Sequence, residues 1–153
     1  MDYSIKQAQP GDFMNVAALD RLAWPAEPDT FIPDGEHAWR LWCEYATVLI
    51  AVELTADQQE FLAGALLMFP TNTEEIFLHK IMVHPDYRGQ GIGSALMKQA
   101  LRDADKTILL TVNPDNSPAV RLYESFGFQV RNRVDGYYRP HEHRLIMEFQ
   151  PSA

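Results

Sequence analysis

A glycine-rich turn is the feature of this 153-residue chain that points most directly to ligand chemistry. The sequence Arg-Gly-Gln-Gly-Ile-Gly occupies residues 88–93, between an apolar run at 75–83 and an amphipathic segment at 92–103. Those patterns predict a buried strand followed by a helix. The first amides of a helix lack intrahelical partners, and glycine lets a phosphate approach them closely. The turn is therefore predicted to bind an anion, with a purely structural turn as the alternative.

The spacing of the glycines separates this turn from two common phosphate-binding loops. A Walker loop continues with Gly-Lys-Ser/Thr, and the dinucleotide fingerprint needs glycine at its first, third and sixth places. The chain has Arg-x-x-Gly-x-Gly instead. Together with its neighbours from Val83 to Met97, this sequence resembles the acyl-CoA motif of the GNAT acetyltransferases.

The resemblance implies how acetyl-CoA, the acyl donor of that family, is held. In the family, the strand before the turn hydrogen-bonds the pantetheine arm, and the amides of the turn bind the pyrophosphate. These cofactor-binding roles would fall on Ile81, Met82, Val83, Arg88, Gly89, Gln90, Gly91, Ile92, Gly93 and Ser94.

A second motif extends the resemblance toward the C-terminus. Residues 116–128 resemble the family signature Asn-x-x-Ala-x-x-x-Tyr-x-x-x-Gly-Phe. The family fold is α/β, with a central mixed, mostly antiparallel sheet of about seven strands flanked by about four helices. In that fold, a splayed pair of parallel strands holds the CoA arm. The second motif also adds Asn116 to the expected cofactor contacts and puts Tyr123 at the position of the catalytic acid.

Transfer of an acetyl group from a thioester to an amine sets three chemical requirements. The ammonium must lose a proton, the carbonyl oxygen must be stabilised, and the departing thiolate takes up a proton. A phenol can donate to sulfur, so Tyr123 is the candidate acid. The alternative is that Tyr123 only fills the core together with Phe126 and Phe128.

Two residues are candidates for the base. Glu75 precedes Arg88 by thirteen positions, where some family members carry a glutamate that acts through water, and His79 lies on the same predicted strand. Alternation along a strand puts residues 75, 77, 79, 81 and 83 on one face if no bulge intervenes. The alternatives are a solvated carboxylate at the strand start and a histidine packed beneath a helix. The pattern does not choose between Glu75, His79 and a water relay.

The elements that must position these residues can be assigned from hydrophobic periodicity. One domain over residues 1–153 is expected from the length and the 46% hydrophobic content. An irregular loop with three prolines is expected at 24–35. Strands are predicted at 3–7, 47–53, 61–69, 75–83, 106–112, 128–134 and 145–149, and helices after Pro10-Gly11 and at 36–45, 92–103 and 117–125.

A tyrosine pair near the C-terminus bears on the acceptor. Residues 135–140 (Asp-Gly-Tyr-Tyr-Arg-Pro) resemble the Tyr-Tyr segment of N-terminal peptide acetyltransferases, which makes Tyr138 a candidate acceptor-site residue. Residues 142–145 depart from the Asp-Ala sequence that follows in those enzymes. The acceptor therefore stays open among small amines, polyamines, amino acids and peptide N-termini.

Composition narrows the classes of partner. A net charge of −8 disfavours nucleic acid and anionic lipid surfaces and favours cationic amines. Cys43 is the sole cysteine, and the chain starts with no signal-like apolar stretch, so a cytoplasmic protein is expected. The spacing of His84, His141 and His143 is not that of a zinc site, and no metal is expected. The C-terminal strands are compatible with a homodimer.

The function that these features predict is acetyl-CoA-dependent N-acetylation of a primary amine by direct attack in a ternary complex. The first alternative is a catalytically silent domain that binds or senses acyl-CoA. The second is a structural α/β domain that does not bind CoA at all.

Overall fold

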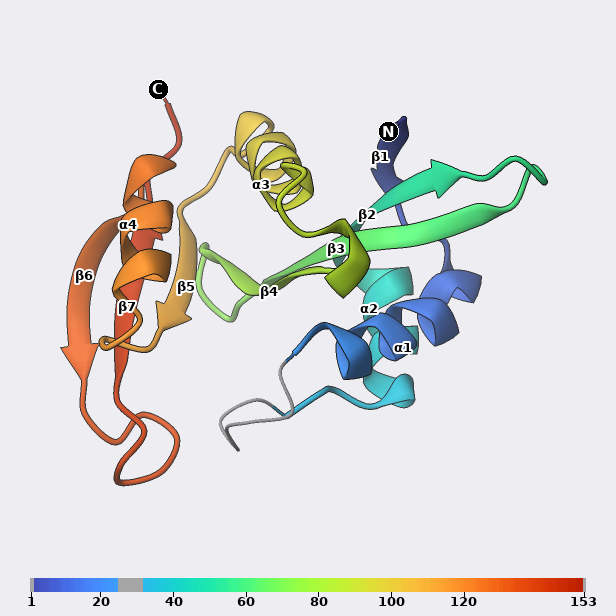
Figure 1. Cartoon of the computed structure of the whole chain (residues 1–153). Helices are drawn as coiled ribbons and strands as arrows, with labels where there is room; N and C mark the ends of the chain where they lie inside the picture. Colours follow the sequence, from blue (N-terminus) through green and yellow to red (C-terminus); the bar gives the residue numbers. More distant parts are fainter. Residues whose placement is uncertain (1, 25–31, 153) are drawn as a thin grey trace.

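The computed structural model describes residues 2–24 and 32–152, and within them it shows a seven-stranded sheet with four α-helices (Figure 1). The sheet order is β1-β2-β3-β4-β5-β7-β6, which confirms the predicted mixed α/β fold. Part of the predicted loop at 24–35, residues 25–31, lies outside the described residues. The strands are β1 (Tyr3–Gln7), β2 (Thr47–Leu54), β3 (Glu60–Pro70), β4 (Ile76–Val83), β5 (Ile108–Val112), β6 (Gln129–Val134) and β7 (Arg144–Phe149). The helices are α1 (Phe13–Ala23), α2 (Glu36–Tyr45), α3 (Ile92–Arg102) and α4 (Ser117–Ser125).

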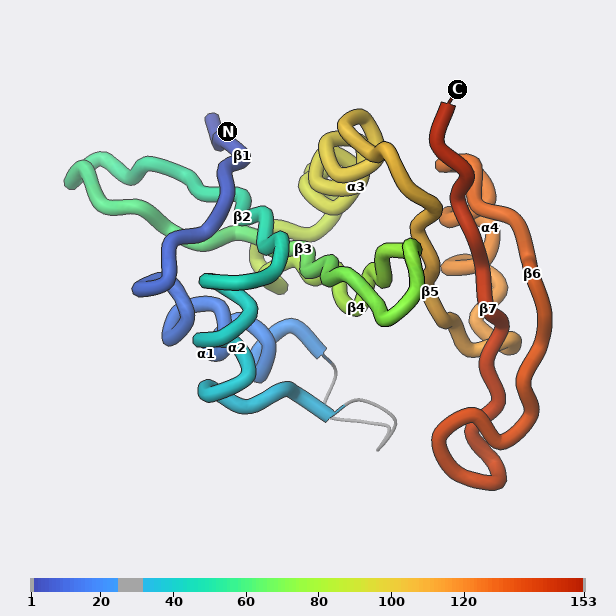
Figure 2. Tube along the Cα trace, turned by 180° about the vertical axis from the view of Figure 1, so that it is seen from behind, coloured from blue at the N-terminus to red at the C-terminus, as the bar shows by residue number. Residues whose placement is uncertain are grey.

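Helices cover both faces of the sheet, and each face has its own core. One core contains Leu96 and Met97 of α3 together with Leu66 of β3, and α4 packs against it. The other contains Trp39 of α2 and Leu67 of β3. Successive residues of β3 thus point to opposite cores, which is why this strand is apolar almost throughout rather than alternating. Figure 2 shows α3 on one side of the central strands, with α1 and α2 on the other.

The only parallel pair in the described sheet is β4 with β5, and it separates early. The two strands are paired at Ile76 with Ile108 and at Phe77 with Leu109, and not beyond. All the other neighbouring strands are antiparallel. After Phe77, β4 runs away from β5, as Figure 1 shows. We call this point the β4–β5 fork, and it confirms the predicted splayed strand pair.

A β-bulge at His79 changes which side chains of β4 share a face. Leu78 and Lys80 pair with consecutive residues of β3, so His79 is an extra residue between them. As a result His79 packs against Trp42 of α2, whereas Ile81 packs against the core on the α3 side. A shared face for residues 75, 77, 79, 81 and 83 was expected only in the absence of a bulge, and this bulge moves residues 81 and 83 to the opposite face from His79.

Candidate active site

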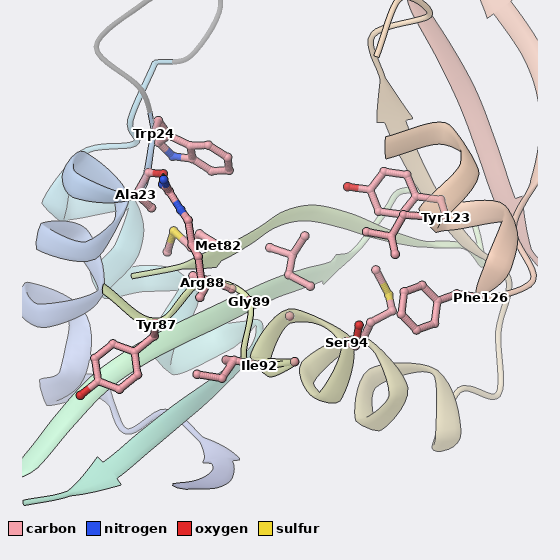
Figure 3. Close-up of a pocket in the computed structure, with 16 residues that line it drawn as sticks. Ala23, Trp24, Met82, Tyr87, Arg88, Gly89, Ile92, Ser94, Tyr123 and Phe126 are labelled. Atoms are coloured by element: carbon pink, nitrogen blue, oxygen red, sulfur yellow. The ribbon is translucent and has the colours of Figure 1, made fainter. Parts of the chain in front are cut away.

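A pocket with a volume of about 580 Å³ lies beside the β4–β5 fork. It runs from the end of α1, past β4 and the glycine-rich turn, to α4 (Figure 3). Its walls are mostly apolar. The lining residues are Ala23, Trp24, Ile81, Met82, Val83, Tyr87, Arg88, Gly89, Gly91, Ile92, Gly93, Ser94, Met97, Leu122, Tyr123 and Phe126.

The glycine-rich turn presents open backbone amides to this pocket. Gly89 and Gly91 have φ angles of 78° and 79°, a region that residues with a Cβ rarely adopt. Gly91 is the N-cap of α3 and has no side-chain cap. The carbonyl of Gly91 accepts from the amide of Ala95, so the amides of residues 92–94 precede the first turn of helix bonds. These amides and the helix dipole favour an anion, as predicted from the sequence.

Arg88 connects this turn to the end of α1. Its Nη2 donates to the carbonyl oxygen of Ala23 at 2.6 Å, a contact across 65 positions that no sequence pattern indicates. Trp24, the next residue along the chain, lines the same pocket. The guanidinium therefore holds the glycine-rich turn and the end of α1 together, and both form walls of one site.

Two expected cofactor contacts lie elsewhere than on the pocket wall. Asn116 is the N-cap of α4, and its Oδ1 accepts from the amide of Ala119 at 3.2 Å. Gln90 belongs to the glycine-rich turn, but it does not line the pocket. The local role that the structure shows for Asn116 is to start the helix that presents Tyr123.

Tyr123 projects from α4 into the pocket. Figure 3 shows its phenolic oxygen pointing toward the wall formed by Trp24 and Arg88. Its ring packs edge-on against Phe128, with 6.0 Å between centroids. Tyr123 therefore packs in the core through its ring and still points its hydroxyl into the pocket. Burial raises the pKa of Tyr123, which keeps the phenol protonated at neutral pH. The arrangement supplies a proton donor inside the pocket.

Glu75 lies away from this pocket, at the paired end of β4. Its Oε2 accepts from Nη1 of Arg131 at 2.9 Å, and its Oε1 accepts from the hydroxyl of Thr73 at 3.3 Å. It lines a different hollow, which also includes Lys106 and Thr107. The Glu75 carboxylate is thus paired with Arg131 on β6 and lies apart from His79, the other candidate base.

His79 belongs to a group of charged residues that sequence spacing did not reveal. Nε2 of His79 lies 3.1 Å from Oδ2 of Asp34, and Nζ of Lys80 lies 2.8 Å from the same oxygen. Burial by itself raises the pKa of Asp34, but hydrogen bonds from His79 and Lys80 outweigh it and lower the pKa to about 2. Asp34 is therefore an ionised carboxylate next to an imidazole.

Asp20 anchors this group from α1. Its side chain is fully buried and accepts from Lys80 Nζ at 2.7 and 2.8 Å. The indole nitrogens of Trp24 and Trp39 and the amide of Asp34 also donate to it. Every oxygen of Asp20 is thus satisfied, as a buried carboxylate requires. We call Asp20, Asp34, His79 and Lys80 the β4 charge cluster.

Tyr138 lies between β6 and β7 and is largely exposed. Its ring is edge-on to Tyr137 and lies beneath the guanidinium of Arg144, at 5.1 Å. Arg144 also pairs with the buried carboxylate of Glu142, which binds Arg139 as well. In Figures 1 and 2 this loop extends toward the end of the molecule where α1 and α2 lie, away from α3.

The described residues contain neither a candidate metal site nor a candidate membrane-spanning helix. No group of three or more His, Cys, Asp or Glu side chains there is arranged to hold a metal ion. No helix in those same ranges has the length and apolar character needed to cross a membrane.

Comparisons with known proteins place this geometry in a family. Residues 16–128 match the model of the acetyltransferase (GNAT) family. The ribosomal protein bS18-alanine N-acetyltransferase of Escherichia coli K12 is 38% identical over 69 residues, which are 42% of this chain and only 47% of that relative. An N-alpha-acetyltransferase of Sulfurisphaera tokodaii is 26% identical over 159 residues, covering 95% of this chain and 92% of the relative.

A solved structure shows the same fold. Arabidopsis thaliana NAA60 in complex with acetyl-CoA has a TM-score of 0.79 at 18% identity, covering 97% of this chain and 99% of that one. The fold, the glycine-rich turn and the β4–β5 fork agree with the family match, which spans most of the sequence. The chain therefore belongs to the GNAT acetyltransferase family.

Proposed function

We propose that this protein transfers the acetyl group of acetyl-CoA to a primary amine. The observation that supports it is one pocket in which the open amides of the glycine-rich turn, the β4–β5 fork and the hydroxyl of Tyr123 meet. The chemical groups of acetyl-CoA match the groups that line this site. The pyrophosphate is an anion for the amides at the start of α3, and the pantetheine arm suits the apolar walls near Met97 and Phe126.

Acetyl-CoA supplies the activated acetyl group when it is bound. The chain's own residues would hold it along β4, because residues 78–83 are not paired with β5 and their main-chain groups can bond a ligand. Ile81 and Val83 line the pocket beside the turn. Tyr123 would protonate the departing sulfur, for which its buried, protonated phenol is suited.

The acceptor we propose is the α-amine of a polypeptide. Two relatives are named as an alanine N-acetyltransferase and an N-alpha-acetyltransferase. An α-amine, with a pKa of about 7.7 to 8.0, is partly neutral at pH 7, whereas lysine at about 10.4 is not. The exposed Tyr138 offers an aromatic contact to a peptide, and the net charge of −8 favours a cationic chain end.

Release of free thiol from acetyl-CoA tests this function. It is measured with peptides that differ in their first residue, alongside polyamines and free amino acids. We expect thiol release that depends on a peptide α-amine, together with thermal stabilisation of the protein by CoA. Stabilisation without thiol release for any amine would favour the silent acyl-CoA-binding domain. Absence of both would contradict the proposal.

A further inference from the structure

The β4 charge cluster contains the geometry of a proton acceptor. Resting on the proposed function, we propose that His79 takes the proton from the acceptor amine and that Asp34 is the positioning residue that orients and electrostatically supports it. The two residues are 45 positions apart in the sequence, and they meet on the face of β4 that α1 and α2 cover, to which the bulge also turns Lys80.

The contact with Asp34 fixes which nitrogen of His79 can act. Asp34 is ionised and can only accept, so Nε2 of His79 carries the hydrogen that lies between them. Nδ1 then holds the free lone pair. Within residues 2–24 and 32–152 no hydrogen bond involves Nδ1 of His79. The nitrogen that can accept a proton is thus the one that no described residue engages.

The charged neighbours of His79 are two carboxylates and one ammonium group. Asp20 and Asp34 carry two negative charges, and Lys80 carries one positive charge. The cluster therefore has a net charge of −1 with a neutral imidazole and becomes neutral when His79 is protonated. Among the described residues, Trp42 on α2 and Phe69 on β3 also pack against the ring, and neither carries a charge. They limit the water that would screen these interactions.

His79 lies near the fork but outside the set of residues that line the pocket, and its side chain is partly exposed. The bulge comes two residues after the last pair of β4 with β5, at the fork where the thioester is expected. The side chains of His79 and Asp34 are 29% and 28% exposed, whereas Asp20 is completely buried. The imidazole and the Asp34 carboxylate are therefore the partly exposed part of the cluster, and Asp20 with Lys80 is its buried part.

The proton balance of the reaction is complete with these residues. The ammonium gives one proton to Nδ1 of His79, and the neutral nitrogen then bonds to the carbonyl carbon of the thioester. The carbon–sulfur bond breaks, and the thiolate takes the proton of the Tyr123 hydroxyl. The second proton lost by the nitrogen returns to the Tyr123 oxygen, and His79 releases its proton to solvent.

Two variants of the cluster test the inference, with E75Q as the matched control. His79→Gln retains a polar side chain that does not titrate, and Asp34→Asn keeps the shape but removes the charge. We expect H79Q to lower kcat by about 100-fold and to abolish the rise of kcat with pH that belongs to the enzyme–substrate complex. D34N should lower kcat by about tenfold and move that rise to lower pH, because the imidazolium loses its counter-charge.

Thermal stabilisation by CoA shows that each variant is folded and binds the donor. The expected result is wild-type stabilisation in all three variants and a wild-type pH profile in E75Q, since Glu75 is paired with Arg131 outside the pocket. The inference is overturned if H79Q and D34N keep the wild-type kcat and pH profile, or if E75Q is the variant that loses the rise. A wild-type protein that acetylates no amine would instead contradict the proposed function itself.

Discussion

Removal of Lys80 from its ion pair with Asp20 should destabilise the fold strongly. The side chain of Lys80 is 11% exposed and that of Asp20 is 0% exposed. Replacing one partner of a buried ion pair leaves an uncompensated charge and costs about 3–5 kcal/mol. Asp20 keeps its bonds from Trp24, Trp39 and the Asp34 amide, so we expect Lys80→Met to cost about 3 kcal/mol, at the lower end of that range.

Urea unfolding of K80M measures this loss, with Lys6→Met as the matched control. Lys6 donates to both oxygens of Glu60, but the two side chains are 43% and 50% exposed. K6M should therefore lower the free energy of unfolding by no more than about 1 kcal/mol. In a domain of this size, K80M should melt about 6–12 °C below the wild type. A K80M variant as stable as K6M would refute the view that this pair secures α1 to β4.

Three further predictions follow from single features of the site. Tyr123→Phe should lower kcat by about 100-fold and leave the affinity for CoA unchanged, because only the proton donor is lost; equal turnover would remove Tyr123 from the mechanism. Gly91→Val should abolish binding of CoA in calorimetry, since the φ of 79° is strained for valine; Gly11→Val, where an added Cβ meets nothing within 4 Å, is the control that should bind normally. Asp34 has a pKa of about 2 when folded against 3.8 otherwise, so its contribution of about 2 kcal/mol is complete above pH 4 and is lost as the pH falls through 2. Urea unfolding between pH 5 and 2 should therefore show a steeper loss of stability for the wild type than for D34N, and parallel curves would contradict the pairing.

Local features of the site could be predicted from the sequence because local physics determines them. β4 was expected at 75–83 and extends over Ile76–Val83, with the glycine-rich turn and α3 following as expected. Glycine at positive φ and the apolar runs of buried strands are visible in a single sequence. The splayed pair of parallel strands was implied by the resemblance to a family, since periodicity does not determine which strands are neighbours.

The β4 charge cluster could not be predicted in this way. The bulge at His79 depends on the register between β3 and β4, which no pattern within β4 encodes. Asp20, Asp34 and Lys80 come from three separate segments and meet only when α1 and α2 pack on the sheet. Lys80 in particular looks like a solvated strand residue in the sequence, and its burial is a result of tertiary packing.

The most direct test of the proposed reaction is identification of its product. The protein is incubated with acetyl-CoA and a peptide that has both a free α-amine and an internal lysine, and the product is sequenced by mass spectrometry. A matched peptide with a blocked N-terminus serves as the control. The account predicts one acetyl group on the α-amine of the first peptide and none on the blocked peptide. Acetylation of neither peptide, with CoA bound, would contradict it, and acetylation of lysine alone would contradict the proposed acceptor.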